Sequence, residues 1–349
     1  MFQLSSSPSR TAVAEGKEFL FFSGYAYLGM QHEPSFVALV EEGMKKYGWL
    51  FPSSRISNTQ LDIYDEMEAL LASITNTASS VCFASGFSSG TVASSLFKGH
   101  PITVCPEAHP AVNKLHQAAL GFDKWAEKTL HIIHENKFDK TPVLIADAVN
   151  PLTGEVNDFD FLQYIEKPLI VIVDDSHGIG LLGKNGEGIA GLLPRKENIE
   201  YIITYSLSKA MGINGGAISC TNKNTADAIK KLSDFTGSTA MSPALTYAFI
   251  HGQRIYGAQR LRLQRNISFL KHLLAGNKAI KNDGRLPIFV LPEQMDGAFF
   301  AKLTIIISSF AYPAPTGRKI NRAVLNALHK EEDLKCLATA ANQHKPLLF

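Results

Sequence analysis

The chain has 349 residues, of which 45% are hydrophobic and 19% are charged, and this composition is typical of a folded globular protein. A formal net charge of +2, without a concentrated block of lysine and arginine, argues against nucleic-acid binding. The first residues lack the basic and apolar parts of a signal peptide, and no apolar run approaches the roughly 20 residues of a membrane helix. We therefore expect a cytoplasmic protein without a membrane span. The cysteines have no short paired spacing, which predicts buried free thiols rather than disulfides or zinc ligands at Cys82, Cys105, Cys220 and Cys336.

The first two thirds of the chain predict alternating strands and helices. Residues 19–30 are typical of a strand or extended segment, and residues 59–74 carry apolar side chains at helical spacing. A second helix is expected at 110–120. This alternation predicts an α/β fold in which a mainly parallel sheet lies between helices. Further strands are expected at 80–84, 102–105, 129–133, 142–146, 169–173 and 201–204.

A change of pattern near residue 243 predicts a second, smaller domain. Apolar residues at helical spacing over 243–274 indicate a long helical connection, and a smaller α+β lobe is expected after it. A chain of this length also exceeds one ordinary hydrophobic core. The lobe is expected to contain strands at 287–291 and 303–307 and a helix at 330–341. We predict an amino-terminal segment 1–30 that packs with the small domain, a large domain 31–250 and a small carboxy-terminal domain 251–349.

Polar residues follow two neighbouring strands of the predicted sheet. The apolar run 168–173 ends in Asp174-Asp175-Ser176-His177, and the run 201–204 leads through Ser206 to Lys209. Ligands bind beyond the carboxyl ends of parallel strands, so we expect Asp174, His177 and Lys209 in one crevice. Pyridoxal 5'-phosphate (PLP) requires this set: a lysine that forms an imine, an anion facing the ring nitrogen, and donors for its phenolate and phosphate.

Three further features add to this prediction. The turn Ser85-Gly86-Phe87 exposes backbone N–H groups that suit a phosphate, and His109 follows another strand, where it can lie flat against a planar ring. Arg322 offers a planar fork that fits a carboxylate. Taken singly, each has a plainer interpretation: a tight turn, a helix cap and a surface arginine. Lys209 alone could equally be a solvated lysine, so the prediction depends on the combination.

Together these residues resemble the α-oxoamine synthases, which belong to the fold-type I PLP enzymes and include 8-amino-7-oxononanoate synthase and 2-amino-3-ketobutyrate coenzyme A ligase. The similarity runs from about residue 19 to residue 337. Several separate motifs in one order are more specific than any of them alone. The motifs are Tyr27-Leu28-Gly29, Ser54-Arg55, Ser85-Gly86-Phe87, Asp174-Asp175-Ser176-His177 with Gly180 and Gly183, Ser206-Leu207-Ser208-Lys209-Ala210, Gly237-Ser238-Thr239-Ala240 with Pro243, and Arg322 with His329.

The resemblance implies a role for each residue of the predicted crevice. Lys209 would bind the aldehyde of PLP as an imine, Asp174 would keep the ring nitrogen protonated, and His177 would hydrogen-bond the phenolic oxygen. His109 would stack on the ring. The segment with Ser238 and Thr239 would reach the phosphate of a neighbouring subunit, which implies a homodimer with a shared active site. The residues implied to bind the cofactor are Gly86, Phe87, His109, Asp174, His177, Ser206, Lys209, Ser238 and Thr239.

The implied activity is that of a biosynthetic PLP-dependent acyltransferase. It would condense an amino acid with acyl-CoA or another acyl thioester, usually with loss of the carboxylate, and Arg322 and Tyr25 would bind substrate. The chain departs from the family mainly on the substrate side, so the acyl donor stays open. Tyr25 replaces a common asparagine, Pro151 and Pro313 replace a serine and a threonine, Ser176 replaces a usual alanine, and the chain starts after the amino-terminal helix of full-length members.

Other functions stay open beside this one. An aminotransferase or an aldolase could use the same fold and cofactor. A catalytically silent scaffold subunit would have no need of Lys209 together with Asp174. A metal hydrolase built on Asp174, Asp175 and His177 lacks a second clustered set of ligands, and no metal is expected.

Overall fold

The computed structural model describes residues 2–113, 120–150, 152–312 and 317–343. By its internal contacts the chain divides into two compact units. We call Pro34–Pro151 with Val156–Arg254 the large unit, and Met1–Glu33 with Leu152–Glu155 and Ile255–Phe349 the small unit. The amino-terminal residues are thus grouped with the carboxy-terminal ones, and the chain enters the small unit three times.

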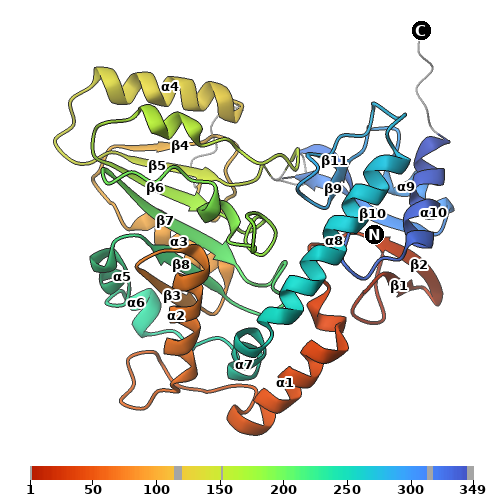
Figure 1. Ribbon diagram of the computed structural model, residues 1–349, viewed down its shortest axis with the longest axis horizontal. Helices are drawn as coiled ribbons and strands as arrows, with labels where there is room; N and C mark the ends of the chain where they lie inside the picture. The colour runs from red at the N-terminus through yellow and green to blue at the C-terminus, as the bar shows by residue number, and fades with distance from the viewer. Residues whose placement is uncertain (1, 114–119, 151, 313–316, 344–349) are drawn as a thin grey trace. The chain divides into compact units, whose positions relative to one another are not determined.

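A six-stranded sheet forms the centre of the large unit, in the order β3-β8-β7-β6-β5-β4 (Figure 1). Neighbouring strands from β4 to β7 pair in parallel, whereas β8 pairs antiparallel with both β7 and β3. The predicted mainly parallel α/β sheet is therefore confirmed. The strands are β3 (Ser79–Phe83), β4 (Ile102–Val104), β5 (Val143–Asp147), β6 (Leu169–Asp174), β7 (Ile199–Ser206) and β8 (Gly216–Cys220).

The central strands form because their sequences can be buried on both faces. β6 has the sequence LIVIVD and every residue of it is buried, as is every residue of β5. Branched apolar side chains without alternation are typical of such fully covered parallel strands. The register pairs Asp147 with Asp174 and Asp174 with Thr204, so β5, β6 and β7 end at the same edge of the sheet.

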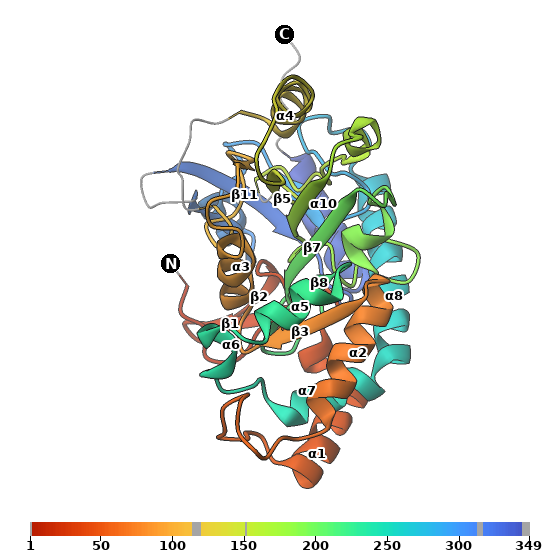
Figure 2. The same ribbon diagram turned by 90° about the vertical axis from the view of Figure 1, so that its left-hand side faces the viewer.

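Helices cover the sheet of the large unit on both sides, with α2 and α3 on opposite sides of β3 (Figure 2). The expected helix at 59–74 is present as α2. Of the helix predicted at 110–120, residues 110–112 form a turn, and residues 114–119 lie outside the described part of the chain. The helices are α1 (Pro34–Tyr47), α2 (Ile63–Thr75), α3 (Gly86–Ser95), α4 (Phe122–Glu135), α5 (Lys223–Ile229), α6 (Ser233–Thr236) and α7 (Pro243–His251).

One predicted strand is wrong. Residues 129–133 lie inside α4. The short apolar run LHII fits either structure, but the buried residues Trp125, Thr129 and Ile133 are four apart and form one face of a helix. The helical spacing becomes visible only when residues before the predicted strand, such as Trp125, are included.

The small unit contains a five-stranded sheet in the order β1-β2-β10-β11-β9. β2 pairs in parallel with β10, which joins the amino-terminal residues to the carboxy-terminal lobe, and Ala12, Ala14, Phe19 and Ile306 form a buried cluster there. The predicted α+β lobe is confirmed, but the extended segment expected to reach residue 30 ends at Phe22. The elements are β1 (Thr11–Ala14), β2 (Lys17–Phe22), α8 (Gln253–Leu273), β9 (Ile288–Val290), α9 (Gly297–Lys302), β10 (Ile305–Tyr312), β11 (Arg318–Val324) and α10 (Glu331–Asn342).

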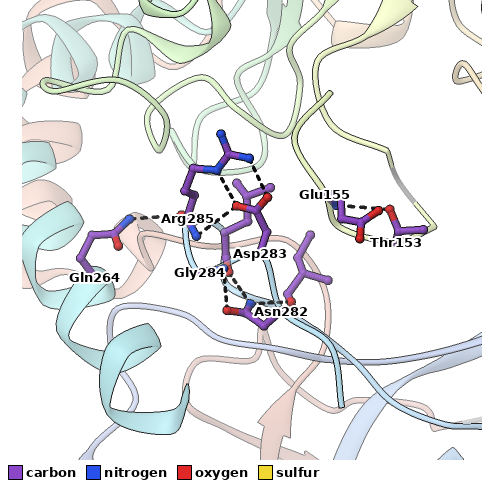
Figure 3. A network of polar contacts seen from close by, with 9 residues as sticks. Thr153, Glu155, Gln264, Asn282, Asp283, Gly284 and Arg285 are labelled. Atoms are coloured by element: carbon purple, nitrogen blue, oxygen red, sulfur yellow. Dashed lines mark hydrogen bonds and ion pairs between the residues drawn. The ribbon is translucent and has the colours of Figure 1, made fainter. Parts of the chain in front are cut away.

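The loop between α8 and β9 is held by its own polar contacts (Figure 3). Arg285 donates through Nε and Nη2 to the two carboxylate oxygens of Asp283, at 2.6 and 2.7 Å. Asn282 Oδ1 accepts from the backbone N of Gly284 at 2.8 Å, and Gly284 has a φ of 87°, which favours glycine. The loop therefore leads into β9 in one defined turn.

The cysteines differ in burial. Cys82, Cys105 and Cys220 are buried free thiols, as expected, whereas Cys336 is exposed. Cys336 lies on α10, whose buried face consists of Leu334, Leu337 and their neighbours one turn on, so the thiol falls on the other side. In the described residues no helix is both long and apolar enough to cross a bilayer.

Candidate functional site

The candidate site lies at the carboxyl ends of β5, β6 and β7, within the large unit. Lys209 follows the end of β7, and its Nζ lies 3.0 Å from Nε2 of His177, in the loop after β6. Asp174 is the last residue of β6 and only 8% of it is exposed. The parallel pairing of β6 with β7 is what brings residues 174, 177 and 209 from distant parts of the sequence to one edge.

The carboxylate of Asp174 is fixed by its own loop. Oδ1 accepts a hydrogen bond from the backbone N of Ser176 at 2.9 Å, and the backbone O accepts from Ala148 N at 2.8 Å. A buried carboxylate needs such donors, because charge without a partner is costly in a site of low polarity. One oxygen of Asp174 is thereby oriented by the protein.

His109 adds an imidazole from the segment after β4. Its backbone N donates to both carboxylate oxygens of Asp147, at 3.2 and 3.0 Å, and its Nδ1 accepts from Ala111 N at 3.1 Å. Burial lowers the pKa of His109, the charge of Asp174 opposes this, and Lys209 lowers the pKa further. The lowered pKa favours the neutral imidazole, and because Nδ1 accepts a hydrogen bond, the proton of the neutral ring lies on Nε2.

Asp147 is a site residue to which the sequence analysis assigns no role. It ends β5, pairs with Asp174 in register, and only 6% of it is exposed. Burial raises the pKa of Asp147 well above its ordinary value, and the charge of Asp174 raises it further, while the backbone N–H of His109 and the charge of Lys209 lower it. Its position at a strand end beside Asp174 is the signal that could have found it.

The first turn of α3 approaches the end of β7 very closely. Ser85 caps the helix: its Oγ accepts from Ser88 N at 3.1 Å. A Cβ atom on Gly86 would lie 2.4 Å from Cβ and 2.8 Å from Oγ of Ser206, so only glycine permits this approach. Phe87 is 61% exposed beside it. The start of α3 thus lies against a hydroxyl at the strand end, and the N-terminus of a helix suits an anion.

Two predicted residues form a separate contact with another loop. Ser238 and Thr239 follow α6, and Ser238 Oγ donates to Phe235 O at 3.0 Å. Thr239 forms an isolated β-bridge with Ser54, and Arg55 N donates to Ser238 O at 3.2 Å. These contacts hold residues 238–239 against the Ser54-Arg55 motif.

The predicted substrate residues belong to the small unit. Arg322 lies on β11, is 2% exposed, and donates from Nη2 to Tyr25 Oη at 2.7 Å. Its guanidinium carbon also lies 5.7 Å from the centre of the Tyr25 ring. Arg322 and Tyr25 therefore form a pair within that unit. Pro151 and Pro313, the two other substrate-side substitutions, lie outside the described residues.

The donor set of the strand-end site fits PLP. It combines a primary amine, a buried carboxylate, a neutral imidazole and a glycine turn at a helix start beside serine hydroxyls. A metal centre is less compatible with it: within the described ranges no group of three or more His, Cys, Asp and Glu side chains could hold a metal ion.

Comparison with known proteins gives relatives that cover nearly the whole chain. The 8-amino-7-oxononanoate synthase of Lysinibacillus sphaericus is 26% identical over 95% of this chain and 90% of that protein. The enzyme of the same name from Buchnera aphidicola is 27% identical over 94% of this chain and 90% of its own length.

Solved structures also match nearly the whole chain. Serine palmitoyltransferase from S. paucimobilis, with a bound PLP–myriocin aldimine, has a TM-score of 0.83 at 16% identity and covers 98% of this chain and 92% of that one. The 8-amino-7-oxononanoate synthase of Francisella tularensis has a TM-score of 0.70 at 24% identity, with coverages of 93% and 97%. These structural matches confirm the fold, and the relatives above, both 8-amino-7-oxononanoate synthases, confirm the resemblance predicted from the sequence.

The family itself follows from a sequence profile rather than from single relatives. The profile described as aminotransferase class I and II matches residues 19–340, which is most of the chain. The match spans both units and includes every described residue of the candidate site. The chain therefore belongs to the aminotransferase class I and II family.

Proposed function

We propose that the chain is a PLP-dependent acyltransferase that condenses an amino acid with an acyl thioester such as an acyl-CoA. One observation carries the proposal: Lys209 Nζ lies 3.0 Å from His177 Nε2, at the strand ends where Asp174 is also buried. The names of the relatives, 8-amino-7-oxononanoate synthase and serine palmitoyltransferase, support acyl transfer over other reactions of the family.

Each residue of the site has a place in the proposed complex. PLP, when bound, supplies an electron sink that stabilises negative charge at the α-carbon of the amino acid. Lys209 would hold the aldehyde carbon of PLP, Asp174 would face the ring nitrogen, and His177 would face the phenolic oxygen. His109 would lie against the ring. The phosphate would be bound by the turn at Gly86 and Phe87 and by the hydroxyl of Ser206, which the close approach of α3 to β7 puts side by side.

The same residues would direct the protons of the reaction. Lys209 Nζ would act as the base that removes the α-proton of the amino acid, and His177 Nε2, at 3.0 Å from it, is positioned to orient the amine. The carboxylate of Asp174 would face the ring nitrogen and stabilise the transition state electrostatically. His109 stays neutral because burial lowers its pKa, so it can contact the ring without adding a competing positive charge.

Arg322 with Tyr25 would bind the carboxylate of a substrate. The guanidinium offers two parallel N–H donors to a carboxylate, and the hydrogen bond to Tyr25 Oη at 2.7 Å holds the guanidinium in one orientation. Tyr25, in place of the family's asparagine, would change the residues that contact the substrate and would leave the residues proposed to bind PLP unchanged.

A homodimer with a shared active site completes the proposal. Trp49, Leu50 and Ile56 are large apolar side chains that are 74%, 48% and 70% exposed. Their loop is joined to residues 238–239 by the Ser54–Thr239 bridge. A second copy covering these side chains would bring Ser238 and Thr239 to the interface, where they could reach the partner's phosphate.

Replacement of Lys209 tests the proposal. After unbound PLP is removed, the wild-type protein is expected to keep a visible absorbance band, and borohydride should convert the bound PLP to a stable adduct, whereas Lys209→Ala should show neither. Lys184→Ala removes an exposed lysine of the same unit and serves as the matched control. A wild-type protein that stays colourless with PLP, or a Lys209→Ala variant that keeps the adduct, would contradict the assignment.

Product analysis then separates the possible reactions. We expect labelled glycine, alanine or serine to cause thiol release from an acyl-CoA, with the label found in an aminoketone. Exchange of the amino group with a keto acid, without thiol release, would instead indicate an aminotransferase. Cleavage of a β-hydroxy amino acid would indicate an aldolase.

A further inference from the structure

Ser176 contacts the end of both central strands of the site. It lies in the loop after β6 and is 9% exposed. Its backbone N donates to Asp174 Oδ1 at 2.9 Å, and its Oγ accepts from the backbone N of Ser206 at 3.0 Å. One residue thus connects the carboxylate that ends β6 to the last residue of β7.

The two groups that Ser176 connects face different parts of the proposed cofactor. Asp174 is the carboxylate proposed for the ring nitrogen. Ser206 lies against the first turn of α3, since a Cβ on Gly86 would come within 2.8 Å of Ser206 Oγ. The hydroxyl of Ser206 is also 2.8 Å from that of Ser208. Ser206 therefore belongs to the end of the site proposed for the phosphate.

We infer that Ser176 is a positioning residue that keeps the phosphate-binding hydroxyl of Ser206 in place relative to the Asp174 carboxylate. The inference rests on the proposed function. A buried backbone N–H without an acceptor is strongly disfavoured, so the hydroxyl of Ser176 determines where the Ser206 amide can lie. An alanine at 176 would keep the N–H for Asp174 but would leave the Ser206 amide without this acceptor.

Comparing PLP with pyridoxal isolates this effect, because pyridoxal forms the same bond to Lys209 but lacks the phosphate. We expect Ser176→Ala to weaken PLP binding about tenfold, equivalent to ~1.4 kcal/mol. Pyridoxal affinity should fall by less than about twofold, so the ratio of the two affinities falls. A general loss of structure would instead lower both affinities together. Binding is measured by titration of the absorbance band.

Thr221, which directly follows β8, provides a matched control because its hydroxyl contacts the other end of β7. Its Oγ1 accepts a hydrogen bond from the backbone N of Tyr201 at 2.9 Å. Thr221 therefore accepts from a backbone N–H near the beginning of β7, as Ser176 accepts from one at its end. Thr221→Val removes that hydroxyl at nearly constant volume. We expect it to leave the ratio of PLP to pyridoxal affinity unchanged. If Thr221→Val lowers the ratio as much as Ser176→Ala does, the positioning role is wrong.

A second variant and a second measurement cover the case in which Ser176→Ala folds poorly. Ser176→Cys keeps a weak acceptor and should give an intermediate ratio of affinities. In the protein without cofactor, hydrogen exchange of the Ser206 amide should be faster in both variants than in wild type. Suppose that the wild-type protein binds PLP. If both the exchange rate of the Ser206 amide and the ratio of PLP to pyridoxal affinity are then the same in the variants as in wild type, the inference is wrong while the proposed function stands. A wild-type protein that does not bind PLP overturns the proposed function and the inference with it.

Discussion

Asp147 is a residue of the site whose burial should make the stability of the fold depend on pH. Its carboxyl group is buried beside Asp174 and accepts two contacts from one backbone N–H. Burial raises the pKa of Asp147 well above the ordinary value of 3.8, with a further contribution from Asp174. Above pH 3.8 the folded protein therefore holds a proton that the unfolded chain has released. The free energy of unfolding should then decrease as the pH rises through the interval up to the raised pKa.

Asp147→Asn is predicted to make stability less dependent on pH. The amide cannot ionise, but its oxygen can still accept from His109 N. We expect the decrease in unfolding free energy between pH 5 and pH 8, measured by urea denaturation without cofactor, to be smaller in the variant. Asp227→Asn, at an exposed position on α5, should leave the decrease unchanged. An equal decrease in wild type and Asp147→Asn would contradict the assigned pKa direction.

The roles proposed for single residues were predictable from sequence only where the position of a residue just after a predicted strand was enough to place it in the site. Asp174, His177 and Lys209 follow apolar runs, and such runs end at one edge of a parallel sheet. The contacts of Asp147 with His109 and of Ser176 with Ser206 join different strands through a side chain and a backbone N–H. Nothing in the local pattern indicates such pairs, because they depend on the register between strands.

At the scale of elements, the site depends on how closely α3 approaches β7. Gly86 begins α3 and lies against Ser206, and Thr204 Oγ1 donates to Ser89 Oγ at 3.0 Å in the next turn. The helix start therefore contacts the strand end without an intervening side chain. This contact is what puts the start of α3 beside the Ser206 hydroxyl.

Gly86→Ala is predicted to force α3 and β7 apart. The added Cβ would lie 2.4 Å from Ser206 Cβ, and overpacking of this kind costs about 1–3 kcal/mol. PLP affinity should fall as well. Gly121→Ala is the matched control, because Gly121 also stands at a helix start but its Cβ would meet nothing within 4 Å. Its unfolding free energy should change by less than about 0.5 kcal/mol in urea denaturation. Equal losses in both variants would contradict the close approach.

Helices and strands were predictable from sequence where a buried segment also had the composition typical of its structure. β6, with its apolar branched residues, was expected over nearly its full length, but β8 was not expected at all. The sequence of β8, GAISC, is short and rich in small residues, and it forms a strand because it pairs with β7 and β3 on its two sides. The polar strand β11 was missed for the same reason, since its pairing with β10 and β9 outweighs its composition.

At the scale of the whole molecule, the chain builds its two units from interleaved segments. Leu152–Glu155 belongs to the small unit although both flanking segments belong to the large one. A Cβ on Gly154 would lie 2.9 Å from Ile288 Cγ2, so this short segment lies against β9. Such an excursion has no compositional signal, whereas the return of residues 1–33 to the carboxy-terminal lobe follows from the β2–β10 pairing.

The exposed loop with Trp49, Leu50 and Ile56 determines the expected assembly. Large apolar side chains exposed close together in the sequence mark an interface more often than a solvated surface. The same loop holds residues 238–239 through the Ser54–Thr239 bridge. A dimer formed on this surface would therefore complete the phosphate site of each partner.

Ile56→Asp is predicted to dissociate such a dimer and to weaken PLP binding at the same time. A charged side chain in a buried interface lacks a partner, so the monomer should dominate in sedimentation velocity at micromolar concentration. Leu261→Asp is the matched control: Leu261 on α8 is 63% exposed, similar to Ile56 at 70%, but lies in the small unit. It should sediment as the wild type does. A monomeric wild-type protein that binds PLP tightly would contradict the shared site, because residues 238–239 would then contribute nothing to it. If Ile56→Asp instead stays dimeric with unchanged PLP affinity, the interface must lie on another surface.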